Sequence, residues 1–428
     1  MKVITGLMAL AMSLLGIPQA MADVPLVHVT GKLSQARGYA SAVTINNYSV
    51  FAGGSYPLEL IWAGSAKVDV FDWQAKRWTA AVLSEGRGGM AVTTTGNLAF
   101  FAGGTQHSLL AYSRAVDIFD AATGKWTSTV LSKARTGIAA AAVGNYALFA
   151  GGNTTSGVLE PTACSVVDIY DTSTVQWSTA SLSQARTGAA AVSVGYQALF
   201  AGGSIARNTA SSAVDIFDST TGQWSSATLS TARQDISAAA VGSYGLFAGG
   251  RAGSSSSGDV DIYDAATGQW SSSALSQPRY GMAAATVNNY AIFGGGYTSS
   301  NGASNAVDIF DASTGQWSTA FLSQARAGLA VAVVGDFVFF GGGSNYSDVV
   351  DIFDSTTGRW STATLSLGRA GLAATSAGGR AAIFAGGADS SGWAANDRID
   401  MFYVVPEPAS LLMLSLGGLA VIRRWRPG

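Results

Sequence analysis

The sequence is poor in the residues on which many enzymes and metal proteins depend. It contains one cysteine, Cys164, and two histidines, His28 and His107, among 428 residues. A single cysteine excludes an intramolecular disulfide framework. Two histidines far apart in the chain give no metal-ligand spacing, and neither has an evident Ser or Cys partner for a nucleophilic triad. We therefore predict no metal, no cofactor and no catalytic residue.

Charge is scarce as well. Charged residues make up 12% of the chain, and the formal net charge is −2. This composition offers neither a basic patch for nucleic acid nor an acidic field for cations. No Gly-x-Gly-x-x-Gly precedes a helical pattern, and no two carboxylates are marked as a converging pair for glycosidase chemistry. Nucleic acid is thus not an expected partner.

What the chain has in abundance is a repeated unit. The phrase Phe-(Ala/Gly)-Gly-Gly occurs eight times at spacings of 44 to 51 residues, and self-similarity at this period predicts a repeat architecture. A short sequence ending in Arg precedes each Gly pair, and Val-Asp-Ile-Phe-Asp or a close relative follows it. The first glycines of the pairs are Gly53, Gly103, Gly151, Gly202, Gly249, Gly295, Gly342 and Gly386.

Each unit reads as four short strands, because β-branched and aromatic residues occur in runs of four to seven broken by Gly, Asn, Asp and Ser. Strand A follows the Arg and consists mainly of Ala, Val and Gly, which suits a crowded innermost position. Strand B ends in the Gly pair, where glycine allows a close backbone approach or a positive φ. Strand C contains the Asp, and an Asp-x-x-Thr-Gly turn leads into strand D at the Trp.

This order of Gly pair, aromatic residue and Trp resembles the kelch repeat, which implies an all-β propeller. The last unit has no Trp after Phe402, whereas alignment backwards from Arg37 places His28 where the Trp of other units stands. We therefore predict eight four-stranded blades over residues 23–404. Residues 27–30 would pair with residues 398–403 and close the ring.

One Arg and one Asp recur in every unit, which favours a structural role over a site, because active sites break symmetry. The structural role would be Arg/Asp pairs or Arg-to-carbonyl bonds between neighbouring strands. The functional alternative is a ring of metal ligands or substrate clamps. The arginines are Arg37, Arg87, Arg135, Arg186, Arg233, Arg279, Arg326 and Arg369, and the aspartates are Asp69, Asp117, Asp168, Asp215, Asp261, Asp308, Asp351 and Asp400.

Targeting segments flank the repeats. Residues 1–22, with one Lys and an apolar run, predict a secretory signal peptide rather than a buried first helix. Residues 405–428 contain an apolar stretch of 14 residues at 409–422, about 21 Å as a helix and short of a hydrocarbon slab of roughly 30 Å. The order of a Pro-Glu-Pro tripeptide, an apolar stretch and a basic tail resembles the PEP-CTERM sorting signal. The tripeptide and the tail are Pro406, Glu407, Pro408, Arg423, Arg424 and Arg426.

That resemblance implies a Gram-negative bacterium, recognition by an exosortase, a transient anchor in the inner membrane, and delivery to the cell surface or extracellular matrix. An ordinary C-terminal membrane anchor is the alternative.

Function is expected where the units differ. In a propeller the B–C and D–A connections share one face, and here they carry aromatic side chains that could stack on sugar rings or anchor a partner. The candidate ligand-binding residues are Tyr56, Trp62, His107, Tyr112, Tyr297, Tyr346 and Trp393. We predict a non-enzymatic matrix propeller that binds polysaccharide. The alternatives are a lyase or hydrolase acting on such polymers and a scaffold that binds another secreted protein.

Overall fold

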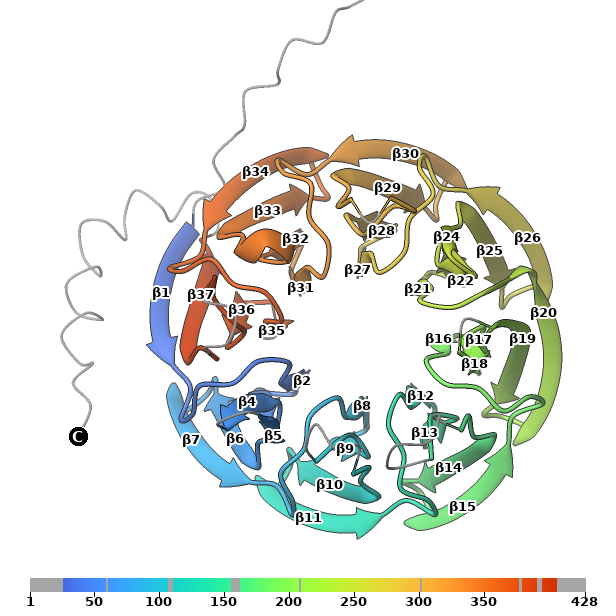
Figure 1. The fold of residues 1–428 in the computed structure, drawn as a ribbon, viewed down its shortest axis with the longest axis horizontal. Helices are drawn as coiled ribbons and strands as arrows, with labels where there is room; N and C mark the ends of the chain where they lie inside the picture. The colour runs from blue at the N-terminus through green and yellow to red at the C-terminus, as the bar shows by residue number, and fades with distance from the viewer. Residues whose placement is uncertain are drawn as a thin grey trace, which may run out of the picture.

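The computed structural model describes residues 26–405 except 59–60, 107–110, 155–161, 208, 301, 377–378 and 391–394. Within these residues the strands form eight large antiparallel sheets arranged around one axis, as the blades of a propeller (Figure 1). The predicted all-β class and the blade number are confirmed. The expected signal peptide and C-terminal helix lie outside the described residues.

Every blade has the predicted strand order, with strand A nearest the axis and strand D on the outside (Figure 1). In order A to D, the strands are β2 (Ser41–Ile45), β3 (Tyr48–Ala52), β6 (Lys67–Asp72) and β7 (Arg77–Val82); β8 (Ala91–Thr95), β9 (Leu98–Ala102), β10 (Ala115–Asp120) and β11 (Lys125–Val130); β12 (Ala139–Val143), β13 (Tyr146–Ala150), β14 (Val166–Asp171) and β15 (Gln176–Ser181); β16 (Ala190–Val194), β17 (Gln197–Ala201), β19 (Thr209–Asp218) and β20 (Gln223–Arg233); β21 (Ser237–Val241), β22 (Tyr244–Ala248), β25 (Asp259–Asp264) and β26 (Gln269–Ala274); β27 (Ala283–Val287), β28 (Tyr290–Gly294), β29 (Ala306–Asp311) and β30 (Gln316–Phe321); β31 (Ala330–Val334), β32 (Phe337–Gly341), β33 (Val349–Asp354) and β34 (Arg359–Thr364); β35 (Ala373–Ser376), β36 (Ala381–Ala385), β37 (Arg398–Val404) and β1 (Leu26–Lys32).

The B–C connections carry small elements of their own. These are the hairpin β4 (Ser55–Leu58) and β5 (Ile61–Gly64) in blade one, β18 (Ser204–Ala206) in blade four, β23 (Arg251–Ala252) and β24 (Ser255–Ser256) in blade five, and the 3₁₀ turn η1 (Ser344–Tyr346) in blade seven. The blades therefore share a framework and differ in these connections.

The N-terminal strand closes the ring, as predicted. β1 pairs antiparallel with β37, from Leu26 opposite Val404 to Lys32 opposite Arg398. His28 lies opposite Phe402 and stacks on its ring with the centroids 4.4 Å apart. The His28 Nε2 is 2.8 Å from the Asp400 Oδ1. The outer strand of the last blade thus comes from the start of the chain.

The hydrophobic core is divided among the interfaces between blades. Because side chains alternate along a strand, Phe51 of strand β3 packs toward blade eight whereas Val50 and Ala52 pack toward blade two. Each pair of neighbouring blades has its own buried cluster, including the pair of first and last blades. Packing between blades, together with strand pairing, therefore holds the ring.

The Gly pair is the backbone junction between blades. Gly53 has φ 60°, and the N–H of Gly54 donates to the carbonyl oxygen of Arg87 in the next blade at 3.1 Å. A Cβ on Gly53 would lie 2.4 Å from that oxygen. The bond from Gly387 to the Arg37 carbonyl oxygen, 3.0 Å, makes the same junction across the closure. Both expected reasons for glycine, positive φ and close approach, are confirmed.

The recurring Arg and Asp form one buried ion pair in each blade. In blade four the Arg186 Nη2 donates to the Asp215 Oδ2 at 2.6 Å and to the Phe200 carbonyl oxygen at 2.9 Å. The other Asp215 oxygen accepts the backbone N–H of Ser183 at 2.8 Å. In blade five, burial lowers the pKa of the Arg233 guanidinium and the neighbouring Asp261 opposes that fall. The predicted pairing of the recurring Arg and Asp is therefore present in all eight blades.

Candidate loop-face binding site

The B–C connections and the D–A linkers meet on one face, which we call the loop face. Hydroxyls of the B–C connections donate to linker glutamines: Ser65 to Gln35 at 2.6 Å, and Ser304 to Gln277 at 2.7 Å. The A–B turns instead contact the C–D turns, as in the hydrogen bond from the Trp73 backbone N–H to the Asn47 carbonyl oxygen, 2.8 Å. These turns form the opposite turn face.

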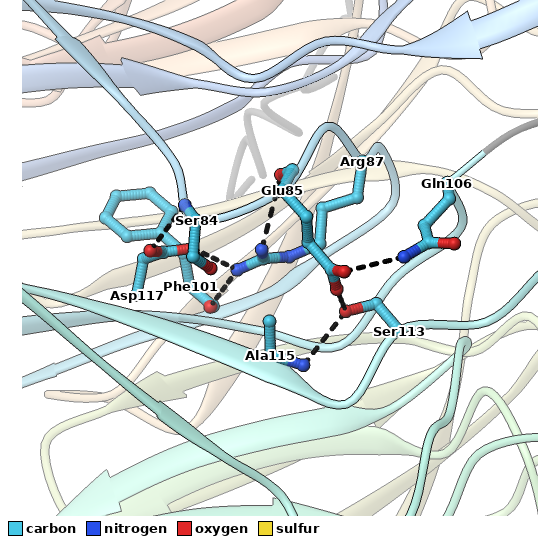
Figure 2. Close-up of polar contacts among 8 residues, drawn as sticks. All are labelled: Ser84, Glu85, Arg87, Phe101, Gln106, Ser113, Ala115 and Asp117. Carbon is cyan, nitrogen blue, oxygen red and sulfur yellow. Dashed lines mark hydrogen bonds and ion pairs between the residues drawn. The ribbon is translucent and has the colours of Figure 1, made fainter.

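Blade two has an acidic residue, Glu85, in its linker. Figure 2 shows its carboxylate accepting hydrogen bonds from the Gln106 Nε2, at 2.6 Å, and from the Ser113 hydroxyl. Next to it, the Arg87 Nη2 donates to Asp117 at 2.7 Å and to the Phe101 carbonyl oxygen at 2.9 Å. Both Glu85 carboxylate oxygens are therefore used to fasten the B–C connection of the same blade.

A ring of left-handed residues lies just before the innermost strands on the loop face. Each of these residues follows the recurring Arg of its unit by two places. Backbone hydrogen bonds join neighbours: the Tyr39 N–H donates to the Gly371 carbonyl oxygen at 2.9 Å, and the Gly188 N–H donates to the Gly137 carbonyl oxygen at 2.9 Å. The φ values run from 53° to 63°. We call this ring the rim, and it comprises Tyr39, Gly89, Gly137, Gly188, Asp235, Gly281, Gly328 and Gly371.

Two rim positions carry side chains. Tyr39 is 62% exposed, and its ring lies against Gly371, where an added Cβ would be 2.8 Å from ring atoms. Asp235 is also exposed and belongs to blade five. Blades one and five lie on opposite sides of the axis, as β2 and β21 show (Figure 1). The rim is therefore asymmetric, with side chains on two opposite blades.

Around Asp235, blades five and six bring charged and aromatic side chains together. The Arg251 Nε donates to the Asp235 carboxylate at 2.7 Å, and the Arg251 Cζ lies 4.9 Å from the centroid of the Tyr280 ring. The Tyr280 and Tyr297 ring centroids are 5.5 Å apart. We call Asp235, Arg251, Tyr280 and Tyr297 the blade-five/six cluster. It offers a paired donor and acceptor beside aromatic surface.

A small cavity lies between the B–C connections of blades three and four. Its volume is about 330 Å³, and its polar lining includes Asn153, Thr187, Ser204 and Arg207. This cavity belongs to the same loop face, and of its two blades only blade four adjoins the blade-five/six cluster.

The residues predicted as ligand-binding are distributed around the loop face. Tyr56 and Trp62 lie in the β4–β5 hairpin, Tyr112 pairs with Thr105, and Tyr346 lies in η1. Each is half-buried rather than exposed, as is Tyr297, which alone of these five lies in the cluster defined above. His107, Trp393 and the sorting residues Pro406, Glu407, Pro408, Arg423, Arg424 and Arg426 fall outside the described residues.

Sequence reasoning missed Tyr39, Asp235, Arg251 and Tyr280. The available signal was departure from the repeat: Tyr39 and Asp235 stand where six units have Gly two places after the Arg. Among the described residues, no group of three or more His, Cys, Asp or Glu could hold a metal ion. In that same part of the chain, every helix is too short or too polar to cross a membrane.

Comparison with known proteins agrees with this architecture. Residues 137–320 and 188–387 each match the KLHDC2/KLHL20/DRC7 Kelch-repeats domain, and residues 404–426 match the PEP-CTERM protein-sorting motif. No curated protein matches the chain. A solved structure titled "Structure of YjhT" is 19% identical, over 68% of this chain and 99% of that one, with a TM-score of 0.48. Because the two overlapping kelch matches together span more than half of its length, the chain belongs to the kelch-repeat family.

Proposed function

We propose that this protein is a non-enzymatic component of an extracellular matrix that binds polysaccharide through its loop face. The PEP-CTERM motif indicates export and sorting to the surface of a Gram-negative bacterium and implies recognition by an exosortase. The observation that carries the binding proposal is the contrast between the two parts of each blade. The framework repeats, whereas the loop face differs from blade to blade.

The repeated side chains already have structural tasks. The recurring Arg and Asp are paired inside the blades. The recurring Trp contacts an aromatic ring of its own blade, as Trp224 does Phe217 with the centroids 5.3 Å apart, and both rings pack in the cluster shared with the preceding blade. The side chains left to meet a ligand are the irregular ones, including Tyr39 and the blade-five/six cluster. Aromatic rings that stack on the C–H face of a sugar, beside groups that bond its hydroxyls, favour a polysaccharide.

The proposed processing divides the chain into a signal peptide at residues 1–22, a propeller at 23–404 and a sorting signal at 405–428. Mass spectrometry of protein released at the cell surface would test this division. We expect an N-terminus at Asp23 and a C-terminus near Pro406. Surface protein that retains Arg423 to Gly428 would contradict removal of the sorting signal.

A binding test uses the full-length chain on an array of immobilised neutral and acidic polysaccharides, followed by pull-down with the best polymer. We expect retention on at least one polymer, weakened in the triple variant Trp62→Ala, Tyr112→Ala, Trp393→Ala. No retention on any polymer would contradict the proposal.

The same incubations separate the alternatives. Release of reducing ends or unsaturated sugars would indicate a hydrolase or a lyase, whereas capture of one secreted protein without sugar would indicate an adhesion scaffold.

A further inference from the structure

We propose that Tyr39 and the blade-five/six cluster are opposite walls of one binding site for a neutral hexose chain at the axis of the loop face. The inference rests on the proposed function and assigns its site and its class of sugar. The one observation behind it is that two of eight equivalent rim positions carry side chains, on opposite blades.

The backbone conformation of Tyr39 is one that glycine would adopt with less strain. Its φ of 53° is left-handed, which L side chains adopt with a penalty and glycine adopts freely. Six blades have glycine at the equivalent place, with φ from 60° to 63°. Since the framework closes without a side chain there, a tyrosine at this position points to a contact outside the framework.

The position of the Tyr39 ring suits such a contact. The ring occupies the space beside Gly371, which has no side chain to displace it, and leaves more than half of the residue exposed. The neighbouring rim residue on the other side, Gly89, also has no side chain, and nothing lies within 4 Å of where its Cβ would stand. An aromatic surface with open space beside it can stack on the apolar face of a pyranose.

The opposite wall supplies the polar contacts. Asp235 accepts and Arg251 donates, and their side chains are 45% and 34% exposed, so both keep capacity to bond a ligand. Their charges cancel, because the two groups are paired at 2.6 Å. Vicinal hydroxyls of a hexose both donate and accept hydrogen bonds, which matches this pair. An acidic sugar would have to compete with Asp235 for Arg251, so the pair favours a neutral one.

The test replaces each rim side chain by the residue that the other blades use. The variants are Tyr39→Gly and Asp235→Gly, and the control is Val175→Gly. Val175 is also exposed and left-handed, with φ 59°, but it lies in a C–D turn on the turn face. All three substitutions remove a left-handed side chain, so we expect each melting temperature to stay the same or to rise by about 2 °C.

Binding should separate the variants. In affinity electrophoresis of the full-length chain through gels containing soluble β-glucan, galactomannan, dextran or alginate, we expect retardation by a neutral polymer. Tyr39→Gly, which loses the stacking ring, and Asp235→Gly, which loses the hydrogen-bonding carboxylate, should each weaken the affinity for that polymer about tenfold. Val175→Gly should leave the affinity unchanged.

Three outcomes would overturn the inference. If a neutral polymer retards both rim variants as strongly as the parent, the site is wrong while the proposed function stands. If only alginate retards the parent, the class of sugar is wrong. If Tyr39→Gly and Asp235→Gly lower the melting temperature along with binding, their role is structural. Absence of retardation by any of the polymers would overturn the proposed function together with the site.

Discussion

At the scale of single residues, each Asp of strand C is the ion-pair partner of a buried arginine. Arg186 is fully buried, and its guanidinium is held by Asp215 and by the carbonyl oxygens of Phe200 and Gln184. An arginine cannot shed its charge in a protein. We therefore expect Asp215→Ala to lower the free energy of unfolding by about 3–5 kcal/mol, measured by guanidinium denaturation at pH 7.

The matched control is Asp218→Ala, three residues along, at the end of β19 where the exposed C–D turn of the same blade begins. Its loss removes turn hydrogen bonds to Thr220 but leaves no buried charge. We expect a much smaller change in stability. Equal effects of the two substitutions would contradict a structural role for the buried pair, as would loss of polysaccharide binding by an Asp215→Ala protein that is still folded.

The turn aspartates predict a dependence of stability on pH. The Thr220 hydroxyl, together with the Thr220 and Thr221 backbone amides, holds the pKa of Asp218 below its ordinary value. A carboxyl whose pKa is lower in the folded state stabilises the fold above its unfolded pKa, near 4, and loses that contribution as the pH falls through the folded value. The same direction holds for Asp120, Asp171, Asp264, Asp311 and Asp354.

We therefore expect the urea midpoint to stay level from pH 7 to about 5 and to fall below about pH 4. The double variant Asp218→Asn, Asp264→Asn should show a shallower fall, because the amide oxygen accepts the same bonds without titrating. Parallel curves for the parent and the double variant would indicate that the acid sensitivity arises elsewhere.

At the scale of elements, the junction between blades depends on two separable properties of glycine. Gly202 and Gly222, in blade four, have φ 62° and 69°. A Cβ on Gly202 would lie 2.6 Å from the Arg233 carbonyl oxygen, whereas around Gly222 nothing lies within 4 Å. Gly222→Ala should therefore cost only the left-handed strain, about 1 kcal/mol. Gly202→Ala should cost clearly more, because strand β17 must also move away from the next blade.

Thermal denaturation of the two alanine variants, made in the same background, measures this difference. Equal losses of stability would mean that the blades adjust to a side chain at the junction, and the close approach would then contribute little to holding neighbouring blades together.

The sequence predicted the elements wherever a physical need recurs in every unit. The Gly pair, the Arg and the Trp fix the ends of strands, so the strand order and the number of blades could be predicted from the repeats. The closing strand could be predicted as well, because His28 aligns with the Trp of the other units. The B–C connections could not be predicted in this way, because each differs from the others. Their aromatic residues were expected to be exposed, yet Trp62 is half-buried in a hairpin whose strands pair Trp62 with Pro57.

The candidate site was harder to predict for the same reason. Tyr39 lies next to strand A, in the most regular part of the repeat, and its importance depends on a backbone angle that only the structure shows. Arg251 and Tyr280 come from different blades, and their contact depends on how neighbouring blades are rotated around the axis. The sequence of a single repeat does not show which residues of the neighbouring blade its side chains will contact.

At the scale of the whole molecule, the stability of the ring depends on where it closes. We call this closure, the pairing of β1 with β37 and the packing of blade eight on blade one, the seam. All the blade interfaces have the same parts, a buried cluster and a Gly-to-Arg backbone bond, but blade eight alone is assembled from both ends of the described chain. Its outer strand β1 covers β37 and contributes His28 to the fully buried Asp400. Burial raises the pKa of Asp400, but the hydrogen bond from His28 and the charge of Arg369 more than offset this and hold it below its ordinary value.

Deletion of residues 26–32 should therefore weaken the entire ring rather than one blade. It would expose the edge of β37, which could then pair with a strand of another molecule, and it would remove His28, the hydrogen-bond partner of Asp400. We expect a lower, broader calorimetric transition and oligomers in size-exclusion chromatography. His28→Ala, which keeps the backbone pairing, should cost only about 1–3 kcal/mol and leave the protein monomeric if the parent is. A deletion variant that melts at the parental temperature would show that blade eight holds with three strands, and that the seam is closed by packing between blades one and eight alone.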